Sequence, residues 1–443
     1  MSKIVIIGAG STVFVKSLVG DLLLLENLKL DTVSLVDIDG KKLEIIQKLI
    51  NKVKDQIGSS IRIEATTDRK KVLAGADYVV STVDIGGLDL YQREIEITDR
   101  FGVNQNVADT LGPGGVFKGL RVVPIIIDIC RDIKRLCPDA ILFNYTNPMC
   151  ITMLSIFYAT EIEAYGLCHS VQGTAELLAN YLGVSMDKVS YLCAGINHMA
   201  WYLIYKVDGV DAYPKLKAIA KDKRLIEKFA EDNEYGGIKL HDDIRFSMLE
   251  HFGYFITESP YHLSEYLPYF RKNHNTIKNY KVDTRWHLEL LKGKDDYYRQ
   301  VREIVSGGKD IEIKKSSEYL PDIIHALETG VYFRANINVL NRSLIDNLPQ
   351  NSCVEVPCLV GRDGIRPLKV GNLPEQCAAL NRSNIGVQIL AAKACLEPDE
   401  DKKKELAKMA IKLDPLTSVV LTLDKIDDMV EELFKLNRNY LRI

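Results

Sequence analysis

The chain opens with a short apolar run that passes directly into two closely spaced glycines. Residues 4–7 are all isoleucine or valine, Gly8 and Gly10 follow, and an apolar-periodic stretch begins at Thr12. The pattern predicts a buried strand, a tight turn and an amphipathic helix. Because a buried strand that runs into a helix is the opening of a crossover between parallel strands, this start favours an α/β fold.

The same alternation continues through the first two hundred residues. Short β-rich runs are separated by amphipathic stretches, which is typical of a doubly wound parallel sheet. Strands are predicted at 3–7, 33–37, 61–65, 78–83, 140–145, 164–168 and 189–194, and helices at 12–25, 40–56, 116–136 and 172–182.

The character of the sequence changes after residue 198. Longer helical segments and aromatic-rich loops follow, with β-rich stretches at 331–339 and 353–370 and helices to the end. No Pro/Gly-rich hinge separates the two parts. We therefore expect a Rossmann-type domain of residues 1–195 and an α+β second lobe of residues 196–443 packed closely against it.

Composition excludes several classes of protein. The 443 residues carry a net charge of −3, with 57 basic and 60 acidic residues interspersed, so we expect no nucleic-acid partner. The first apolar run is too short for a secretory leader or a membrane span, and we expect no membrane association. Nine cysteines without paired spacing indicate free thiols in a reducing compartment, and we predict a cytoplasmic protein.

The first turn has features of a dinucleotide site. Gly8 allows the tight turn, Gly10 lets the backbone approach a pyrophosphate, and Ser11 begins the helix that supplies N–H donors. Val13 stands where a third glycine is usual. Asp37 ends the second strand, where a carboxylate binds ribose hydroxyls and repels a 2′-phosphate, so NAD is favoured over NADP. The alternative is that Asp37 only caps the next helix.

Polar residues follow three of the predicted strands. Asn147 comes after one, Cys168 and His169 after the next, and Asn197 and His198 after the third. Because ligands bind beyond the carboxyl ends of parallel strands, we expect these motifs to converge. A thiolate with an imidazole suits a transition metal such as Mn(II), Fe(II), Co(II) or Ni(II). The alternative is a core cysteine and an ordinary buried histidine.

Two further segments carry candidate residues. Asp109 precedes the glycine cluster 112–115, which opens a predicted helix. Glu265 and Tyr266 place a carboxylate beside a phenol, with Tyr269 three residues further on. The alternatives are a helix-entry turn for the first segment and aromatic packing between the lobes for the second.

Taken together and in order, these segments resemble glycoside hydrolase family 4. The resemblance covers nearly the whole chain, and although each string alone is weak, the ordered set is specific. Its segments are Gly8–Ser11, Ala108–Gly115, Asn144–Pro148, Cys168–Thr174, Gly195–Met199, Glu265–Tyr266, Val354–Cys358 and Val370–Pro374.

The resemblance implies a lactate/malate dehydrogenase-like superfold, a tightly bound NAD and a divalent metal, usually Mn(II). Cys168 and His198 match the metal ligands of the family, and Tyr266 matches its catalytic base. Asn147 matches a substrate contact, and Asp109 an acidic position that raises the basicity of the tyrosine. The second lobe would then carry substrate, metal and subunit contacts, in a homodimer or homotetramer.

The residues that begin at Cys168 indicate the subfamily. The string Cys168-His169-Ser170-Val171 is similar to that of bacterial α-galactosidases of the melibiose-cleaving type, whereas the phospho-glycosidases carry Asp or Asn after the cysteine. We interpret His169 and Asn197 as substrate-binding residues, and His169 also as a candidate acid. α-Galacturonides and α-glucosides are alternative substrates.

The implied reaction combines redox and elimination chemistry. Oxidation at C3 with hydride transfer to NAD⁺ acidifies the C2 proton, which Tyr266 removes. Elimination expels the C1 substituent, water adds and the hydride returns. A malate- or lactate-dehydrogenase-like enzyme and a non-catalytic NAD or sugar sensor are the alternative classes; the first requires a His/Asp relay and an Arg clamp.

Overall fold

Six parallel strands form one half of the central sheet. The computed structural model describes residues 2–10, 12–25, 28, 30–232, 234–235, 238–282, 286–307 and 311–441. Across the sheet the strands are β3 (Arg62–Thr66), β2 (Leu30–Val36), β1 (Ser2–Ile7), β4 (Tyr78–Ser81), β5 (Ile141–Asn144) and β6 (Ala164–Gly166). This strand order is that of a Rossmann-type dinucleotide-binding fold, which confirms the predicted fold class.

The four helices predicted in this half are present. They are α1 (Thr12–Leu24), α2 (Gly40–Ile57), α5 (Gly112–Leu136) and α7 (Ser170–Leu182). Three more were not predicted: α3 (Lys70–Leu73), α4 (Gly87–Arg100) and α6 (Met149–Ala159). Helix α6 is apolar along nearly its whole length and packs against α5 and α16 (Glu375–Leu396). Without a polar face it has no helical periodicity for the sequence to reveal.

The other half of the sheet is largely antiparallel. From β6 outward it contains β12 (Phe333–Leu340), β13 (Cys353–Gly361), β7 (Val189–Ile196), β8 (Met199–Val207) and β9 (Val210–Asp211), and β14 (Gly364–Pro367) pairs with β13. Two strands from late in the chain thus lie between β6 and β7. Strand β7 is antiparallel to both of its neighbours. The motifs were expected to converge because they follow parallel strands. That reason is wrong for β7, which is not parallel to its neighbours.

A row of backbone pairs brings the loops after β6 and β7 to one level of the sheet. Gly166 pairs with Asn338, Asn338 with Glu355, and Glu355 with Gly195. Cys168 follows this row at the end of β6, and His198 follows it at the end of β7. The convergence thus depends on the insertion of β12 and β13.

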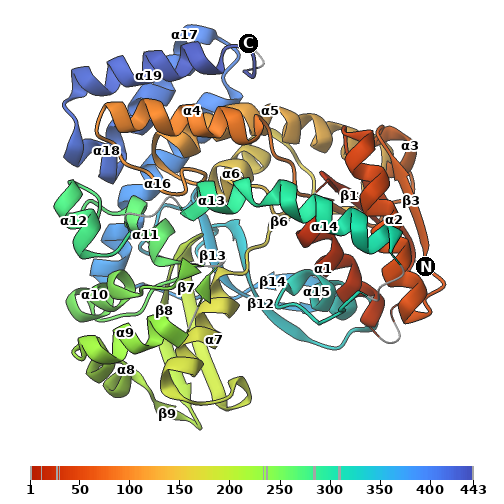
Figure 1. Ribbon diagram of the computed structural model, residues 1–443, viewed down its shortest axis with the longest axis horizontal. Coiled ribbons are helices and arrows are strands. Elements are labelled where there is room, and N and C mark those ends of the chain that lie inside the picture. The colour runs from red at the N-terminus through yellow and green to blue at the C-terminus, as the bar shows by residue number, and fades with distance from the viewer. Residues whose placement is uncertain are drawn as a thin grey trace.

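The remaining elements cover the sheet and build the second lobe (Figure 1). All nine cysteines are buried and free. No helix among the described residues has the length and apolar character that a membrane span requires. The remaining elements, which lie outside the central sheet, are α8 (Tyr213–Ala220), α9 (Lys223–Asp232), β10 (Glu234–Tyr235), β11 (Ile238–Lys239), α10 (Asp243–Phe252), α11 (Pro260–Tyr266), α12 (His274–Asn279), α13 (Trp286–Lys292), α14 (Lys294–Ser306), α15 (Tyr319–Thr329), α17 (Glu400–Leu413), α18 (Pro415–Val420), α19 (Leu423–Asn437) and the 3₁₀ turn Met186–Lys188.

A buried ion pair ties the C-terminal helix to the Rossmann half. Arg121 of α5 donates to Glu94 of α4, and their side chains are only 4% and 3% exposed. Asn437, at the end of α19, accepts from Arg121 at 2.6 Å and donates to Glu94 at 2.9 Å. Because these groups satisfy one another, the loss of any one leaves a buried polar group without its partner.

We expect Arg121→Ala to lower the free energy of unfolding by about 3–5 kcal/mol, because it leaves the Glu94 carboxylate buried and unpaired. The matched control is Arg100→Ala. Arg100 also joins α4 to α19, through Glu432, but the two side chains are 63% and 39% exposed. The control should cost less than about 1 kcal/mol. Equal losses for the two variants in urea unfolding would contradict this account.

Candidate active site

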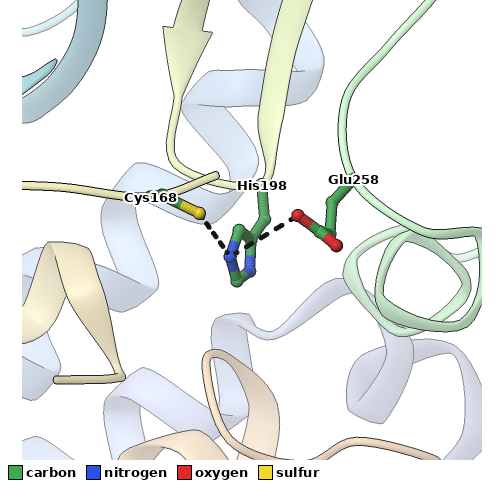
Figure 2. Close-up of side chains that lie close together, drawn as sticks. All are labelled: Cys168, His198 and Glu258. Carbon is green, nitrogen blue, oxygen red and sulfur yellow. Dashed lines mark hydrogen bonds and ion pairs between the residues drawn. The ribbon is translucent and has the colours of Figure 1, made fainter. Parts of the chain in front are cut away.

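Three side chains from separate loops meet at the edge of the sheet (Figure 2). Cys168 lies between β6 and α7, His198 in the turn between β7 and β8, and Glu258 just before α11. The Cys168 Sγ is 3.3 Å from the His198 Nε2, and the Glu258 Oε2 is 3.9 Å from the same nitrogen. All three are buried, and their ligand atoms lie within 4.8 Å of one another.

This group has the composition of a transition-metal site. Thiolate, imidazole and carboxylate together suit a borderline divalent ion, and three protein ligands leave coordination positions for substrate oxygens. Cys168 and His198 were predicted from the sequence as metal ligands, whereas Glu258 was not. The available signal was its place directly before Ser259, which caps α11, the helix that carries Tyr266.

Burial and charge act differently on the three groups. Burial raises the pKa of the Cys168 thiol to about 12, so an ion that binds there must displace the thiol proton. Burial also acts to raise the pKa of Glu258, but His198, His262 and His169 outweigh it and hold that pKa at about 2. Glu258 therefore enters the group as a carboxylate.

Tyr266 contacts the opposite nitrogen of the His198 ring. Its hydroxyl lies 3.1 Å from the His198 Nδ1, and Thr110 lies 3.4 Å from the same atom. Burial, and next the Asp109 carboxylate, raise the pKa of Tyr266 well above its usual value. A phenol in this place becomes a base only when positive charge is added nearby.

Asp109 lies beside this tyrosine and contacts the substrate-contact candidate Asn147. The Asn147 amide donates to Asp109 at 3.1 Å, and the Lys118 ammonium is 3.9 Å from the same carboxylate. Burial acts to raise the pKa of Asp109, but Lys118 and the neighbouring histidines lower it below its usual value. The structure thus brings Asp109, Asn147 and Tyr266 into one site.

Glu265 holds the loop that ends in Asp109. Its carboxylate accepts hydrogen bonds from the backbone N–H groups of Asn106, Val107 and Ala108, the last at 3.0 Å. Burial raises the pKa of Glu265 to about 7, against the effect of Arg271. From the sequence Glu265 was only a carboxylate beside a phenol, whereas in the structure it supports the loop that leads to Asp109.

The glycine cluster that opens α5 packs against the same Asp109 loop. A Cβ on Gly114 would lie 2.5 Å from the Ala108 carbonyl oxygen, and one on Gly115 would lie 2.4 Å from the carbonyl carbon of Thr110. These glycines let the Asp109 loop lie directly on the start of the helix. They are therefore more than a helix-entry turn.

The predicted dinucleotide loop follows β1. Gly8 has a φ of +89°, and a Cβ there would lie 2.7 Å from the backbone of Thr82, at the end of β4. Asp37 accepts from the Gly10 N–H at 2.7 Å and from the Asp39 N–H at 2.9 Å. Asp39, and not Asp37, caps α2, so the capping alternative for Asp37 is wrong.

The geometry of this loop fits a dinucleotide. Gly8 must be glycine for the close turn, and the Asp37 carboxylate lies beside the loop at the end of β2, where a ribose binds in such folds. Tyr298 of α14 donates to the Gly10 carbonyl, so this helix of the second lobe covers the loop. Ser11, predicted at the same turn, lies outside the described residues.

The other predicted residues lie around the Cys168 loop. His169 forms an ion pair with Glu318 at 3.4 Å, and this contact raises the pKa of the His169 imidazole to about 10. The Asn197 side chain is buried beside Glu355, where it acts to lower the pKa of a carboxyl that burial raises to about 8. Tyr269, the alternative phenol, is 41% exposed and packs on Phe252 and Phe270.

Two family profiles match successive parts of the chain. Residues 3–184 match the family 4 glycosyl hydrolases, and residues 193–417 match the C-terminal domain of the same family. The chain belongs to family 4 of the glycosyl hydrolases. The resemblance stated from the motifs is thereby confirmed, and the glycosidase class with it.

Two α-galactosidases are similar to this chain over nearly its whole length. An α-galactosidase of Bacillus subtilis (strain 168) is 38% identical over 444 residues, which is 100% of this chain and 99% of the relative. An α-galactosidase of Rhizobium meliloti (strain 1021) is 34% identical and covers 97% of this chain and 87% of the relative. A solved 6-phospho-α-glucosidase from gut microorganisms, in complex with NAD and Mn²⁺, shares the fold with a TM-score of 0.84 at 20% identity, with 99% of each chain covered.

We expect Glu258→Gln to weaken Mn(II) binding about tenfold or more, a loss of about 1.4 kcal/mol or more, because an amide oxygen lacks the carboxylate charge. Titration calorimetry measures the affinity, and the melting temperature should stay near that of the wild type. Glu250→Gln, on the exposed face of α10, is the matched control and should bind as the wild type does. Equal affinities for the two variants would remove Glu258 from the site.

Proposed function

We propose that this family 4 glycosyl hydrolase cleaves α-galactosides, with NAD and a divalent metal, by oxidation at C3, deprotonation at C2, elimination and water addition. The observation that carries the proposal is the His198 ring. One of its nitrogens faces Cys168 and Glu258, and the other faces Tyr266. The residues that could bind a metal and the candidate base thus contact opposite nitrogens of one imidazole.

The residues divide among the roles that the reaction needs. Cys168, His198 and Glu258 would hold the metal, and Gly8, Gly10 and Asp37 the dinucleotide. When bound, NAD would supply a reversible hydride acceptor, and the metal would supply Lewis-acid polarisation of substrate oxygens and a positive charge that opposes the rise in the pKa of Tyr266.

The remaining steps belong to the side chains of this chain. Tyr266 takes the C2 proton, the electron pair forms the C1–C2 double bond, and the C1–O bond breaks. His169 gives a proton to the departing oxygen. Water then adds at C1 and a proton returns to C2. Asp109, held ionised by Lys118, opposes the loss of the proton from Tyr266 and favours its uptake, which strengthens the base.

The choice of α-galactosides follows from the relatives and from one motif. Two full-length relatives are α-galactosidases, and Cys168-His169-Ser170-Val171 carries histidine where the phospho-glycosidases carry Asp or Asn. Asn147 and Asn197 offer amide groups for sugar hydroxyls at the same edge. Faster cleavage of α-galacturonides or α-glucosides than of α-galactosides would transfer the proposal to those substrates.

A subunit assembly and a compartment complete the proposal. Apolar side chains stand exposed along the C-terminal helices, which favours a homodimer or homotetramer. Nine unpaired thiols suit the reducing cytoplasm. The exposed side chains are Met409, Leu413, Val419 and Leu423.

Cleavage of nitrophenyl α-galactoside should require both NAD⁺ and Mn(II). We expect protein stripped of both to be inactive, EDTA to abolish the activity, and re-addition of both to restore it. A panel of nitrophenyl α- and β-glycosides measures this, with absorbance at 340 nm followed in parallel. Full activity of the stripped protein in the absence of both NAD⁺ and Mn(II) would contradict the proposal. Net production of NADH would also contradict it, because it indicates a dehydrogenase.

Hydrolysis in D₂O should place deuterium at C2 of the released sugar, because deprotonation there precedes C–O cleavage. Tyr266→Phe keeps the ring but removes the base, and we expect turnover to fall about 10²–10⁴-fold, with C2 exchange falling in parallel. Tyr269→Phe is the matched control and should leave both unchanged, since Tyr269 is exposed outside the site. NMR of the product measures the label. Wild-type product without deuterium would contradict the elimination route.

A further inference from the structure

Glu318 is a partly buried carboxylate that the proposed steps do not use. It directly precedes α15, at the position where a side chain usually caps the helix, yet it makes no capping hydrogen bond. Instead its Oε1 lies 3.4 Å from the His169 Nδ1, with only 12% of the Glu318 side chain exposed. The carboxylate is directed at the residue that follows Cys168.

The loop that carries Glu318 is fixed from two sides. The Ser316 N–H donates to Asp21 of α1 at 3.0 Å, and the Ser316 hydroxyl donates to the same carboxylate. The Gln172 amide of α7 donates to the Ser317 carbonyl at 2.9 Å. The loop that carries Glu318 is therefore bound both to α1 and to α7, and these two contacts hold Glu318 beside the start of α7.

His169 lies between this carboxylate and solvent. Its side chain is 54% exposed, whereas Cys168 beside it is buried. With Nδ1 bound to Glu318, the other ring nitrogen is left for a ligand, because the partner of one imidazole nitrogen determines what the other can do. The position of Glu318 thus selects which atom of His169 faces the site.

The other side of the Glu318 carboxylate faces a buried phenol. The Tyr145 hydroxyl is buried, and after burial itself the nearby Glu318 carboxylate is the largest cause that raises the pKa of this phenol. Glu318 therefore lies between the His169 imidazole and the Tyr145 phenol.

We propose that Glu318 is the positioning residue of the leaving-group subsite. Its Oε1 accepts from the His169 Nδ1–H, so that the His169 Nε2–H is directed at the glycosidic oxygen. The proton passes from Nε2 to the oxygen as the C1–O bond breaks, and the electron pair of that bond goes to the oxygen. This inference rests on the proposed glycosidase function.

The dependence on the leaving group tests the proposal. Melibiose has a poor leaving group that needs a proton, whereas nitrophenolate departs without one. We expect Glu318→Gln to lower kcat for melibiose about 10- to 100-fold, the usual effect of losing a partner that orients a functional histidine, with nitrophenyl α-galactoside cleaved nearly as before. His169→Asn should show the same selectivity, and the double variant no further loss.

Asp322→Asn is the matched control, because it removes one carboxylate charge from the first turn of the same helix. Asp322 pairs with Lys315 and not with His169. It should leave both substrates unaffected, and Glu318→Asp should recover part of the melibiose activity. A Glu318→Gln enzyme that is slowed equally on both substrates, or on neither, would overturn the proposal.

The pairing itself is measured without turnover. In protein with ¹⁵N-labelled histidine, the Nδ1–H signal of His169, assigned by its absence in His169→Asn, should persist in Asp322→Asn and disappear in Glu318→Gln. Persistence in Glu318→Gln would overturn the inference. A wild-type enzyme that cleaves no α-galactoside contradicts the proposed function alone, since the NMR result then decides the Glu318–His169 contact independently.

Discussion

The imidazole of His198 is the contact on which the site depends. Its Nε2 faces Cys168 and Glu258, while its Nδ1 faces Tyr266 and Thr110. The ring is held in a two-residue turn with a φ of +62°, a backbone region that non-glycine residues adopt at a cost in energy. The tight β7–β8 hairpin sets that conformation and fixes the ring between the two groups.

The sheet and the second lobe each hold one side of this ring. Strands β12 and β13 place β7 at the level of β6, and so bring His198 to Cys168. Helix α11 supplies Tyr266 from the other side, and Glu265 of the same helix binds the loop that leads to Asp109. The site is thus assembled by elements that also carry the core packing, which keeps its geometry defined.

Charge in the site is balanced by burial. Neighbouring histidines lower the pKa of Glu258, and Lys118 with neighbouring histidines lowers that of Asp109, whereas burial raises the pKa values of the Cys168 thiol and the Tyr266 phenol. Two acids thus carry negative charge on either side of the His198 ring. Glu258 lies on the side of the ring where Cys168 could join it in holding a metal ion, whereas Asp109 lies on the side of Tyr266.

The sequence by itself determined the Rossmann half and most of the chemistry. Local features can be predicted from residues that are close together in the sequence. They include the strand periodicity, the Gly8 turn and Asp37 at the end of β2. Cys168, His198 and Tyr266 were found as motifs, although the reason given for their convergence assumed a parallel β7.

Only the tertiary structure decided which residues complete the site. Glu258 and Glu318 come from loops without a regular pattern, and each acquires its role from a partner far away in the sequence, His198 for one and His169 for the other. The apolar helix α6 and the insertion of β12 and β13 between β6 and β7 were hidden for the same reason. Pairing over such distances depends on packing and register, which no local sequence pattern records.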